Sequence, residues 1–398
     1  MGYRDYSKSD FENLSRQINI MALFGNGVDI QLTEYLDLPY RTTYQDFYNY
    51  LCNKNFDNSN LLFKKMQEDK ESNKDNWSDF ENSLIELVED TGNNLEDLKE
   101  NLKVFQIEFS NFLNEIITPS NLAKLGTEAT ENKTAISTFE NILGDLSEKN
   151  YKKIHLVDKM KYQIKESHCL FNWEILNFNY TSLLDNVLNL DREQYDPHKF
   201  KRSDRQITFN INPKGYDSVK TWGVPSYLMV NIDHPHGYQN IPKSILFGFD
   251  NVEQPKKYFG SERGVLNEED IKPFLKPYWA QNDKKYKSYF QETDLFIIYG
   301  LSLGKTDFWW WNNIFNALLE TDAELIIYNY DKDKLDDEDE HKHKHVINNF
   351  IEKAKGIDRI LSSEEATKLH GKIAVVNYNS KTELQAFKLS SNKSKNTN

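Results

Sequence analysis

The sequence predicts an α/β fold that is built on a mainly parallel sheet. The run Ile18–Phe24 is apolar except for Asn19 and ends at a Gly-x-Gly turn, which is typical of a buried parallel strand that leads into a helix. Further strand-like and helical segments alternate after residue 290, which favours right-handed βαβ units. Between the first strand and these later segments lie charged stretches with apolar residues at three- and four-residue intervals, which indicate a large helical insertion.

The composition indicates a folded chain that does not bind nucleic acid by default. Of its 398 residues, 38% are hydrophobic and 13% aromatic, and the net charge of -13 repels a phosphate backbone. Cys52 and Cys169 are too few for a disulfide framework or a four-thiolate zinc site, so a reducing cytoplasm is expected. Residues 1–19 hold no apolar signal core, and no run of about 18 apolar residues occurs, so neither secretion nor a membrane span is expected.

The chain is expected to divide into a discontinuous Rossmann-like α/β core (17–55 and 168–385), a helical insertion (56–167) and a polar tail (386–398). Strands are expected where β-branched and aromatic residues form short runs, and a helix is expected over Thr306–Leu319. The polar, Thr-rich segment Gly126–Ser137 is expected to be a loop. The expected strands after the first are Asn172–Tyr180, Ile207–Asn212, Leu228–Asp233, Ile245–Phe249, Asp294–Gly300, Glu324–Tyr330 and Lys372–Tyr378.

The first turn, which contains Gly25, Asn26, Gly27 and Asp29, is a candidate nucleotide contact. Its glycines allow close approach of a ligand, and the N–H groups that follow favour anions or hydroxyls. The dinucleotide fingerprint fails because Ile30 stands where its third glycine belongs. Asp29 repels a pyrophosphate, so a ribose or an amide fits better; alternatively, Asp29 is a helix cap and the turn is purely structural.

Three further loops follow predicted strands, and ligands of open α/β sheets collect at the carboxyl ends of strands. Asn179 can hold a water or a sugar hydroxyl, and it shares its loop with Thr181, which alternatively caps the next helix. His236, next to Gly237, is expected to be exposed enough to titrate near neutrality as a general base. Ser302 follows the strand that ends at Gly300. Asp307 heads the next helix, and N-capping is its simplest role.

The order of these motifs resembles the bacteriophage abortive-infection AbiH family over roughly Ile18 to Leu319. The motifs are Asn-Gly-x-Asp in the first turn, Trp77-x-x-x-Glu81, Phe-Asn-Tyr-Thr around Asn179, His236-Gly237, Phe-Gly-Phe-Asp ending at Asp250, and Tyr-Gly-x-Ser-Leu-Gly-x-Thr-Asp ending at Asp307. Chains that resemble this family usually carry His where this sequence has Leu301. The resemblance implies antiviral defence, with a phage or host protein as a possible trigger.

The AbiH family in turn looks like a remote branch of sirtuin-like, NAD-cleaving defence domains. That resemblance implies a sheet of sirtuin-like type, NAD as substrate, Asn179 and His236 as catalytic residues, and Gly25, Asn26, Gly27, Asp29, Thr181, Gly237, Ser302 and Asp307 as the binding residues. Thr181 stands where sirtuin-like domains carry Asp, and two cysteines cannot form the four-Cys zinc module of the deacetylases. Simple cleavage of NAD is therefore expected rather than deacetylation, with no cofactor beyond the substrate.

Other interpretations stay open at this point. Gly300-x-Ser302-x-Gly304 matches a nucleophile elbow, and Asp322 or Asp331 followed by His370 would complete a serine hydrolase. The sheet alternatively binds a nucleotide without catalysis, while the insertion contacts another protein or forms a homo-oligomer.

Two motifs have competing structural interpretations. Trp77 and Glu81 are expected on one helix face, where the ring packs on the core or the carboxylate reaches the pocket. The triplet His341, His343 and His345 is interleaved with lysines that oppose a metal ion, so a solvated loop or helix start is expected.

Overall fold

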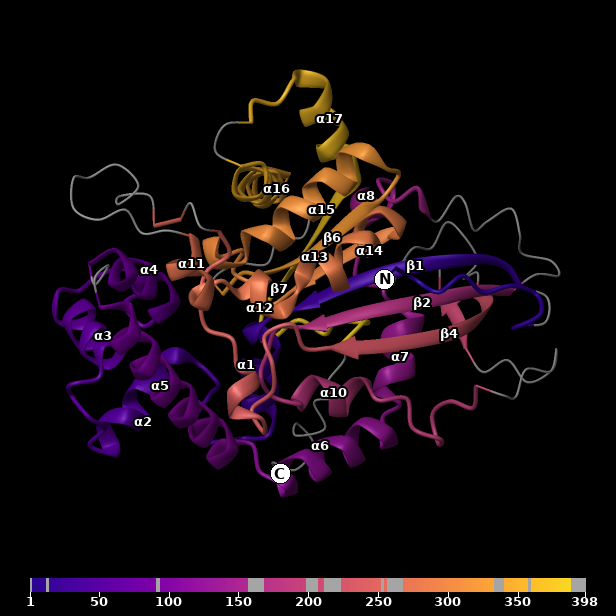
Figure 1. Cartoon of the computed structure of the whole chain (residues 1–398). Coiled ribbons are helices and arrows are strands. Elements are labelled where there is room, and N and C mark those ends of the chain that lie inside the picture. Colours follow the sequence, from indigo (N-terminus) through magenta and orange to yellow (C-terminus); the bar gives the residue numbers. More distant parts are fainter. Residues whose placement is uncertain are drawn as a thin grey trace.

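A parallel sheet in doubly wound order forms the centre of the computed structural model (Figure 1). Along the sheet the strands lie in the order β3-β4-β2-β1-β5-β6-β7, and all neighbours are parallel except β3, which is antiparallel to β4. The structure describes residues 2–11, 14–90, 94–156, 168–197, 207–210, 223–251, 254–255, 268–332, 340–356 and 359–387. The described strands are β1 (Leu14–Phe24), β2 (His168–Asn177), β3 (Thr208–Asn210), β4 (Gly223–Asp233), β5 (Leu295–Tyr299), β6 (Glu324–Tyr330) and β7 (Ile373–Tyr378).

The six parallel strands, counted in chain order, lie as 3-2-1-4-5-6, which is the order of dinucleotide-binding α/β folds. The predicted α/β class with a mainly parallel, Rossmann-like sheet is confirmed. In this order the chain reverses direction across the sheet between β1 and β5, and their carboxyl ends flank the crevice where ligands of such folds bind.

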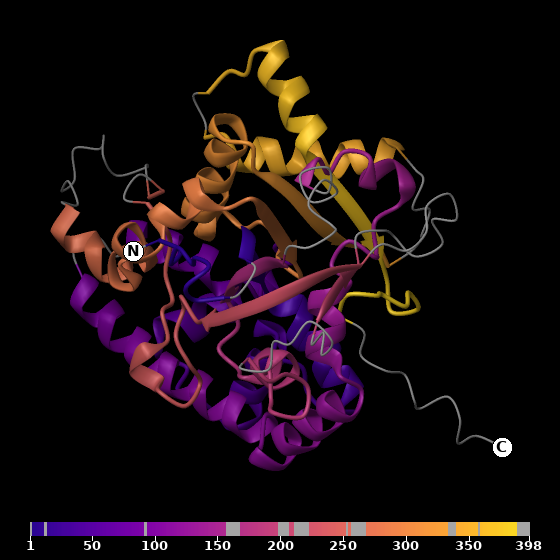
Figure 2. The ribbon, with the colours of Figure 1, turned by 90° about the vertical axis from the view of Figure 1, so that its right-hand side faces the viewer.

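Helices cover both faces of the sheet (Figures 1 and 2). One face packs on α14–α17 and the other on α6, α7 and α10, while α2–α5 lie beyond the carboxyl ends of the strands. The described helices are α1 (Asn26–Tyr35), α2 (Tyr44–Asn53), α3 (Leu61–Glu71), α4 (Phe80–Asp90), α5 (Leu95–Ile116), α6 (Pro119–Glu131), α7 (Thr134–Glu140), α8 (Glu148–Tyr151), α10 (Leu183–Leu188), α11 (Glu268–Ile271), α12 (Lys276–Ala280), α13 (Asn282–Lys285), α14 (Lys287–Glu292), α15 (Phe308–Glu320), α16 (Glu340–Ala354) and α17 (Ser363–Lys372), with 3-10 turns η1 (Pro242–Ser244), η3 (Lys272–Phe274) and η4 (Lys305–Asp307).

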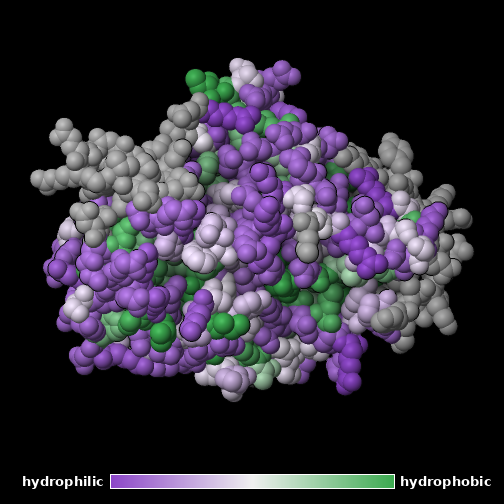
Figure 3. Space-filling model, viewed as in Figure 1, coloured by the Kyte–Doolittle hydropathy of each residue, from purple (hydrophilic) through white to green (hydrophobic). Residues whose placement is uncertain are grey.

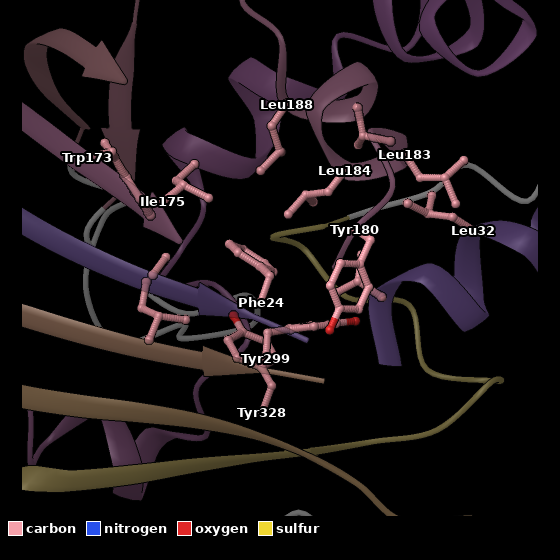
Figure 4. Close-up of a cluster of buried hydrophobic side chains, with 14 of the residues drawn as sticks. Phe24, Leu32, Trp173, Ile175, Tyr180, Leu183, Leu184, Leu188, Tyr299 and Tyr328 are labelled. Atoms are coloured by element: carbon pink, nitrogen blue, oxygen red, sulfur yellow. The ribbon is translucent and has the colours of Figure 1, made fainter. Parts of the chain in front are cut away.

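The hydrophobic core lies on both faces because successive side chains of a strand point in opposite directions. In β1, Ala22 and Phe24 belong to the large cluster under α2–α7 and α10, and Met21 and Leu23 belong to the cluster under α14–α17. Figure 4 shows part of the first cluster, in which side chains of β2, β5, β6 and α10 gather around Phe24. The strand is therefore buried on both faces, as its nearly continuous apolar run predicts.

The turn after β1 packs directly on the backbone that follows β5. Gly25 N–H donates to the Tyr299 carbonyl and Gly27 N–H to the Gly300 carbonyl, both at 2.9 Å. A Cβ added at Gly27 would lie 2.7 Å from the Cα of Gly300, which itself has φ +68°. The first turn therefore needs glycine for contact with the protein's own backbone, and these two N–H groups do not face a ligand as predicted from the sequence.

Most predicted strands are present, with shifted ends. The segment 324–330 is a strand as predicted, β2 begins earlier and ends before Asn179, and the predicted helix at 306–319 is η4 followed by α15. Residues 211–212 of the predicted strand Ile207–Asn212 lie outside the described residues.

Two segment predictions are wrong. Ile245–Phe249 is not a strand, because its backbone bonds go to His236 and Phe274 and only one isolated bridge forms, at Phe249. Gly126–Ser137 is not a loop, because α6 extends to Glu131 and α7 begins at Thr134, with Leu125 and Ala129 buried on one face of α6. Thr-rich polarity here reflects a solvated helix face, not a break in the helix.

The view of Figure 3 shows a largely hydrophilic surface with scattered hydrophobic patches. Among the residues that the structure describes, none of the helices combines the length and the apolar character needed to cross a lipid bilayer. Helices α3–α8 fill the described part of the predicted insertion, but the division into domains stays a prediction. Residues 388–398 of the predicted tail lie outside the described part of the chain.

We expect Gly27→Ala to destabilise the fold by roughly 1–3 kcal/mol, because the new methyl group overpacks against Gly300. The matched control is Gly371→Ala, which also replaces a helical glycine but has no atom within 4 Å of the added Cβ. Helix propensity alone predicts that both changes stabilise the protein by up to about 1 kcal/mol. Urea unfolding measures both variants, and equal stabilities would contradict the backbone contact.

Candidate functional site

The loops after β1, β2, β4 and β5 meet at one edge of the sheet, because the carboxyl ends of parallel strands share an edge. Asn179, in the loop after β2, donates from Nδ2 to the Gly25 carbonyl at 3.1 Å, and its side chain is buried. Asn26 accepts from the Thr42 hydroxyl through Oδ1 at 2.7 Å. The sequence-predicted residues of the first two loops are therefore in contact, but their polar groups bind one another.

Asp29 and Thr181 form a second contact between these loops. Asp29 lies inside α1 and not at its cap, since Gly25 occupies the N-cap position, so the capping interpretation is wrong. The Thr181 hydroxyl donates to Asp29 Oδ2 at 2.6 Å, and Thr181 also accepts from Leu183 N–H. Burial raises the pKa of Asp29 from 3.8 to about 7, and the Thr181 hydrogen bond only partly offsets this rise.

A histidine that the sequence analysis did not single out fixes the backbone of Asn179. The Nδ1–H of His234 donates to the Asn179 carbonyl at 2.8 Å, and Nε2 lies 3.0 Å from Asp185 Oδ1. Asn177 donates to the other oxygen of Asp185 at 3.0 Å and accepts from Asn179 N–H. In the sequence, His234 belongs to the His-Pro-His-Gly stretch, of which only the second histidine, His236, is predicted to be a site residue.

His236 is buried, so the expectation of an exposed, titrating histidine is wrong. Phe178 packs edge-on against its ring at 5.0 Å, and the Tyr180 ring lies 6.4 Å away. Burial, reinforced by the positive charge of Lys276, lowers the pKa of His236 from 6.5 to about 3. Gly237 follows with φ +95°, and a Cβ there would lie 2.0 Å from the Ser244 carbonyl oxygen, which explains the glycine.

His236 faces Asp307, with Nε2 3.4 Å from Oδ1. The side chain of Asn179 turns instead to the first turn, while its neighbours Phe178 and Tyr180 contact the imidazole. Asn179 and His236 are therefore linked through the neighbours of Asn179. Asp307 occupies the N-cap position of α15 without capping it, and Asp250 accepts from Trp309 N–H in its place.

Lys276 joins Asp307 to Glu81 in a buried charge cluster. Its Nζ lies 2.9 Å from Asp307 Oδ1 and 3.3 Å from Glu81 Oε1, and only 2% of the residue is exposed. Although burial lowers the pKa of Lys276, the carboxylates of Asp307, Glu81 and Asp250 raise it above its ordinary value. We call Glu81, His236, Asp250, Lys276 and Asp307 the buried ion cluster.

The three carboxyl groups of the buried ion cluster differ in their proton affinity. Burial raises the pKa of Glu81 to about 7, against the opposing effect of Lys276. Burial, together with the charge of Asp307, also raises the pKa of Asp250 well above 3.8. Burial alone would raise the pKa of Asp307, but Lys276 and His236 lower it. Perturbed groups of this kind collect at functional sites more often than elsewhere.

Glu81 comes from the predicted insertion and reaches the sheet edge, but it does not line the cavity, so the interpretation that its carboxylate reaches the pocket stays a prediction. Glu81 also accepts from Gly248 N–H at 3.2 Å. Trp77 precedes α4 and does not share a helix face with Glu81; its ring packs against Tyr48 at 4.9 Å. The ring of Trp77 therefore packs on the core, as one interpretation expects.

A cavity of about 1210 Å³ opens at the same edge, beside the ends of β5, β6 and β7. Gly27 and Ser302 line it, whereas Asn179 and the buried ion cluster do not. The segment Gly300–Leu303 forms one wall, and from Gly304 the chain continues to Asp307. Of the sequence-predicted site residues, Gly27 and Ser302 therefore line the cavity, whereas His236 and Asp307 belong to the buried ion cluster.

Ser302 and His370 of the hydrolase interpretation do not come together, whichever of Asp322 and Asp331 is taken as the third residue. His370 lies in α17, which leads into the amino end of β7, and Asp322 precedes the amino end of β6. Ser302 follows the carboxyl end of β5, so at about 3.3 Å per residue the length of the strands puts roughly 15 Å or more between Ser302 and His370. His370 instead bonds Asn348 Oδ1 at 3.0 Å.

The histidine triplet begins α16, as one interpretation expected, and His343 within it is buried. In the described ranges no three His, Cys, Asp or Glu side chains are grouped so as to hold a metal ion.

The sequence model of the bacteriophage abortive infection AbiH family matches residues 21–330. The chain belongs to the AbiH family. A comparison with curated proteins finds no match.

The AbiH match includes all four loops and every member of the buried ion cluster. It ends at Tyr330, before β7 and the segment 379–387, which line part of the cavity. Leu301 contacts the first turn, since a Cβ at Gly25 would lie 2.3 Å from its Cδ2. The sirtuin-like resemblance stays a prediction.

We expect Asp29→Asn to stabilise this AbiH protein by more at pH 8 than at pH 5. The pKa of Asp29 is about 7 in the folded protein and 3.8 in the unfolded chain, so between these pH values the folded protein binds more protons. The free energy of unfolding therefore falls as pH rises from about 4 to 7. The amide avoids this loss, which amounts to roughly 4 kcal/mol at most above pH 7. Urea unfolding at both pH values tests this against the exposed control Asp75→Asn; a gain that does not depend on pH would contradict it.

We expect Lys276→Met to destabilise the protein by about 3–5 kcal/mol at pH 7.5, because Glu81 and Asp307 lose their buried counter-charge. The control Lys54→Met removes an exposed partner of Glu115 and is expected to change stability little. Adding Glu81→Gln to Lys276→Met is expected to restore part of the loss. Equal effects of the two methionine variants in denaturant titrations would argue against the cluster.

Proposed function

We propose that this AbiH protein is a nucleotide N-glycosidase that cleaves NAD to nicotinamide and ADP-ribose. The observation that carries the proposal is the buried ion cluster at the carboxyl edge of a sheet in dinucleotide-binding order. The family assignment supports a defence role, in which loss of NAD would halt the infected cell. NAD is the substrate, and no other cofactor is required.

The charge of the cluster suits this reaction. Three carboxyl groups surround one lysine and a histidine that is neutral at pH 7, so the cluster carries excess negative charge whenever Glu81 or Asp250 is ionised. The nicotinamide ring of NAD is cationic, and the ribose becomes oxocarbenium-like as the ring departs. Fixed carboxylates in a desolvated site stabilise such developing positive charge more strongly than water does.

The buried ion cluster contains groups that can accept the proton and stabilise the charges that arise in the reaction. The ribose–nicotinamide bond breaks and its electron pair leaves with nicotinamide, while a water oxygen bonds to the ribose carbon. The neutral imidazole of His236 takes the water proton, and Asp307, 3.4 Å away, stabilises the imidazolium that forms. Glu81, whose pKa is about 7, is a second group able to exchange a proton near neutrality.

Asn179 acts in this scheme as a positioning residue. Its side chain ties the loop after β2 to the first turn, and its backbone carbonyl holds His234. Phe178 and Tyr180, on either side of it, then pack against the His236 ring and keep it directed at Asp307.

A nucleotide-binding sensor without catalysis is the second candidate, and the cavity favours it. The cavity and the buried ion cluster do not share a lining residue, so a nucleotide can bind in the cavity without meeting the cluster. Binding of NAD without release of nicotinamide would support the sensor.

We expect the purified protein to release nicotinamide from NAD, as measured by liquid chromatography. His236→Ala and Asp307→Asn are each expected to lower the rate roughly 10²–10⁴-fold, because each removes a group that handles the proton or the developing charge. Unchanged thermal unfolding would show that the variants fold.

His370→Ala is the matched histidine control, because this residue lies at the opposite edge of the sheet, and it is expected to keep full activity. The proposal fails if no nicotinamide is released, either by the purified protein or in phage-infected cells that produce it. It also fails if His370→Ala abolishes release.

A further inference from the structure

The cavity beside β6 and β7 is lined by charged, amide and tyrosine side chains that the proposed reaction does not use. Its floor is the ends of these strands, and its walls come from α1, α16 and the segments 300–303 and 379–384. Its volume of about 1210 Å³ exceeds that of an ordinary small-molecule pocket, which is roughly 300–1,000 Å³.

Cationic side chains gather around this cavity although the chain carries a net charge of -13. Lys332, Lys381 and Arg41 line it, and the opposing acids among its lining residues are Glu34 and Glu383. Arg41 pairs with Glu34 at 2.6 Å, so each cancels the other. Among the lining residues that the structure describes, Lys332 and Lys381 then remain with Glu383, an excess of one positive charge that favours an anionic ligand.

The same cavity offers ring faces and amides. Tyr330 is 50% exposed, and its ring stands edge-on to that of Tyr378 at 5.5 Å, so one ring face is available to a flat ligand. Side-chain amides of Asn329, Asn349 and Asn379 lie around it. Asn329 Nδ2 donates to Asn377, and Asn379 Oδ1 accepts from Lys381 N–H, which leaves the Asn329 oxygen and the Asn379 amino group to meet base edges or ribose hydroxyls. Rings, amides and lysines together match the three parts of a nucleotide.

We infer that this cavity binds a nucleoside phosphate, with the base on Tyr330 and the phosphates at Lys332 and Lys381. The inference does not rest on the proposed reaction, because none of the five members of the buried ion cluster lines the cavity. The excess carboxylates of that cluster repel phosphates, whereas the lysines of the cavity attract them. The ligand is either the adenosine diphosphate half of NAD or a separate nucleotide.

A shared segment links the cavity to the buried ion cluster. Gly300, Leu301, Ser302 and Leu303 line the cavity, and four residues later Asp307 pairs with Lys276. Leu303 has φ +54°, which is strained for a leucine, so this segment holds a backbone conformation that side-chain packing must maintain. A nucleotide in the cavity therefore contacts the segment that positions Asp307.

The test is calorimetric titration of the full chain with ADP. ADP is expected to bind the wild type, and the double variant Lys332→Glu/Lys381→Glu is expected to bind at least about tenfold more weakly, because two phosphate partners become repulsive. Tyr330→Ala is expected to weaken binding about fivefold or more, as loss of a stacking partner does. Lys8→Glu, a charge reversal at an exposed lysine that does not line the cavity, is the control.

His236→Ala separates this inference from the proposed reaction. The variant is expected to bind ADP as the wild type does, whether or not NAD is ever cleaved. If NAD competes with ADP for this variant, the cavity binds the adenosine diphosphate half of NAD. If both bind at the same time, the cavity binds a separate nucleotide. The inference is overturned if ADP does not bind, or if the double lysine variant binds it as tightly as the wild type.

Discussion

The ammonium group of Lys276 is the interaction on which the sheet edge depends. It lies within ion-pair distance of Asp307, which follows β5, and of Glu81, which comes from α4 almost two hundred residues earlier. Removing water from two carboxylates costs more than a single surface pair returns, and only a buried cation at this place offsets that cost. The lysine therefore joins α4 to the sheet edge, beside the apolar contacts of α2–α5.

The sequence predicted the fold well where the signal is local. The apolar run before Gly25 and the alternation after residue 290 predict a parallel sheet because buried strands and crossover helices each leave a periodic pattern. Ile245–Phe249 has the composition of a strand, yet its backbone groups bond to His236 and Phe274, and no periodicity reveals such partners. The order of the strands depends on pairing between segments that are distant in the sequence, so only the structure shows it.

The sequence placed the candidate residues at strand ends, but it did not show which way their side chains point. Parallel topology brings Asn179, His236 and Asp307 to one edge, so their presence there follows from three strand ends. Whether a side chain faces a ligand or its own backbone depends on packing, and Asn179 faces Gly25. Lys276 could not be found, because a lysine before a proline in a chain rich in charge has no distinguishing pattern.

The burial of His236 has a cause outside the sheet. Glu81 accepts from Gly248 N–H and the Ser110 hydroxyl donates to the Gln239 carbonyl, so α4 and α5 both hold the loop that follows His236. A histidine in an open loop would titrate near neutrality, whereas this one stays neutral because helices far away in the sequence exclude water from it. Helices α4 and α5 therefore contribute, through this loop, to the burial that keeps His236 neutral.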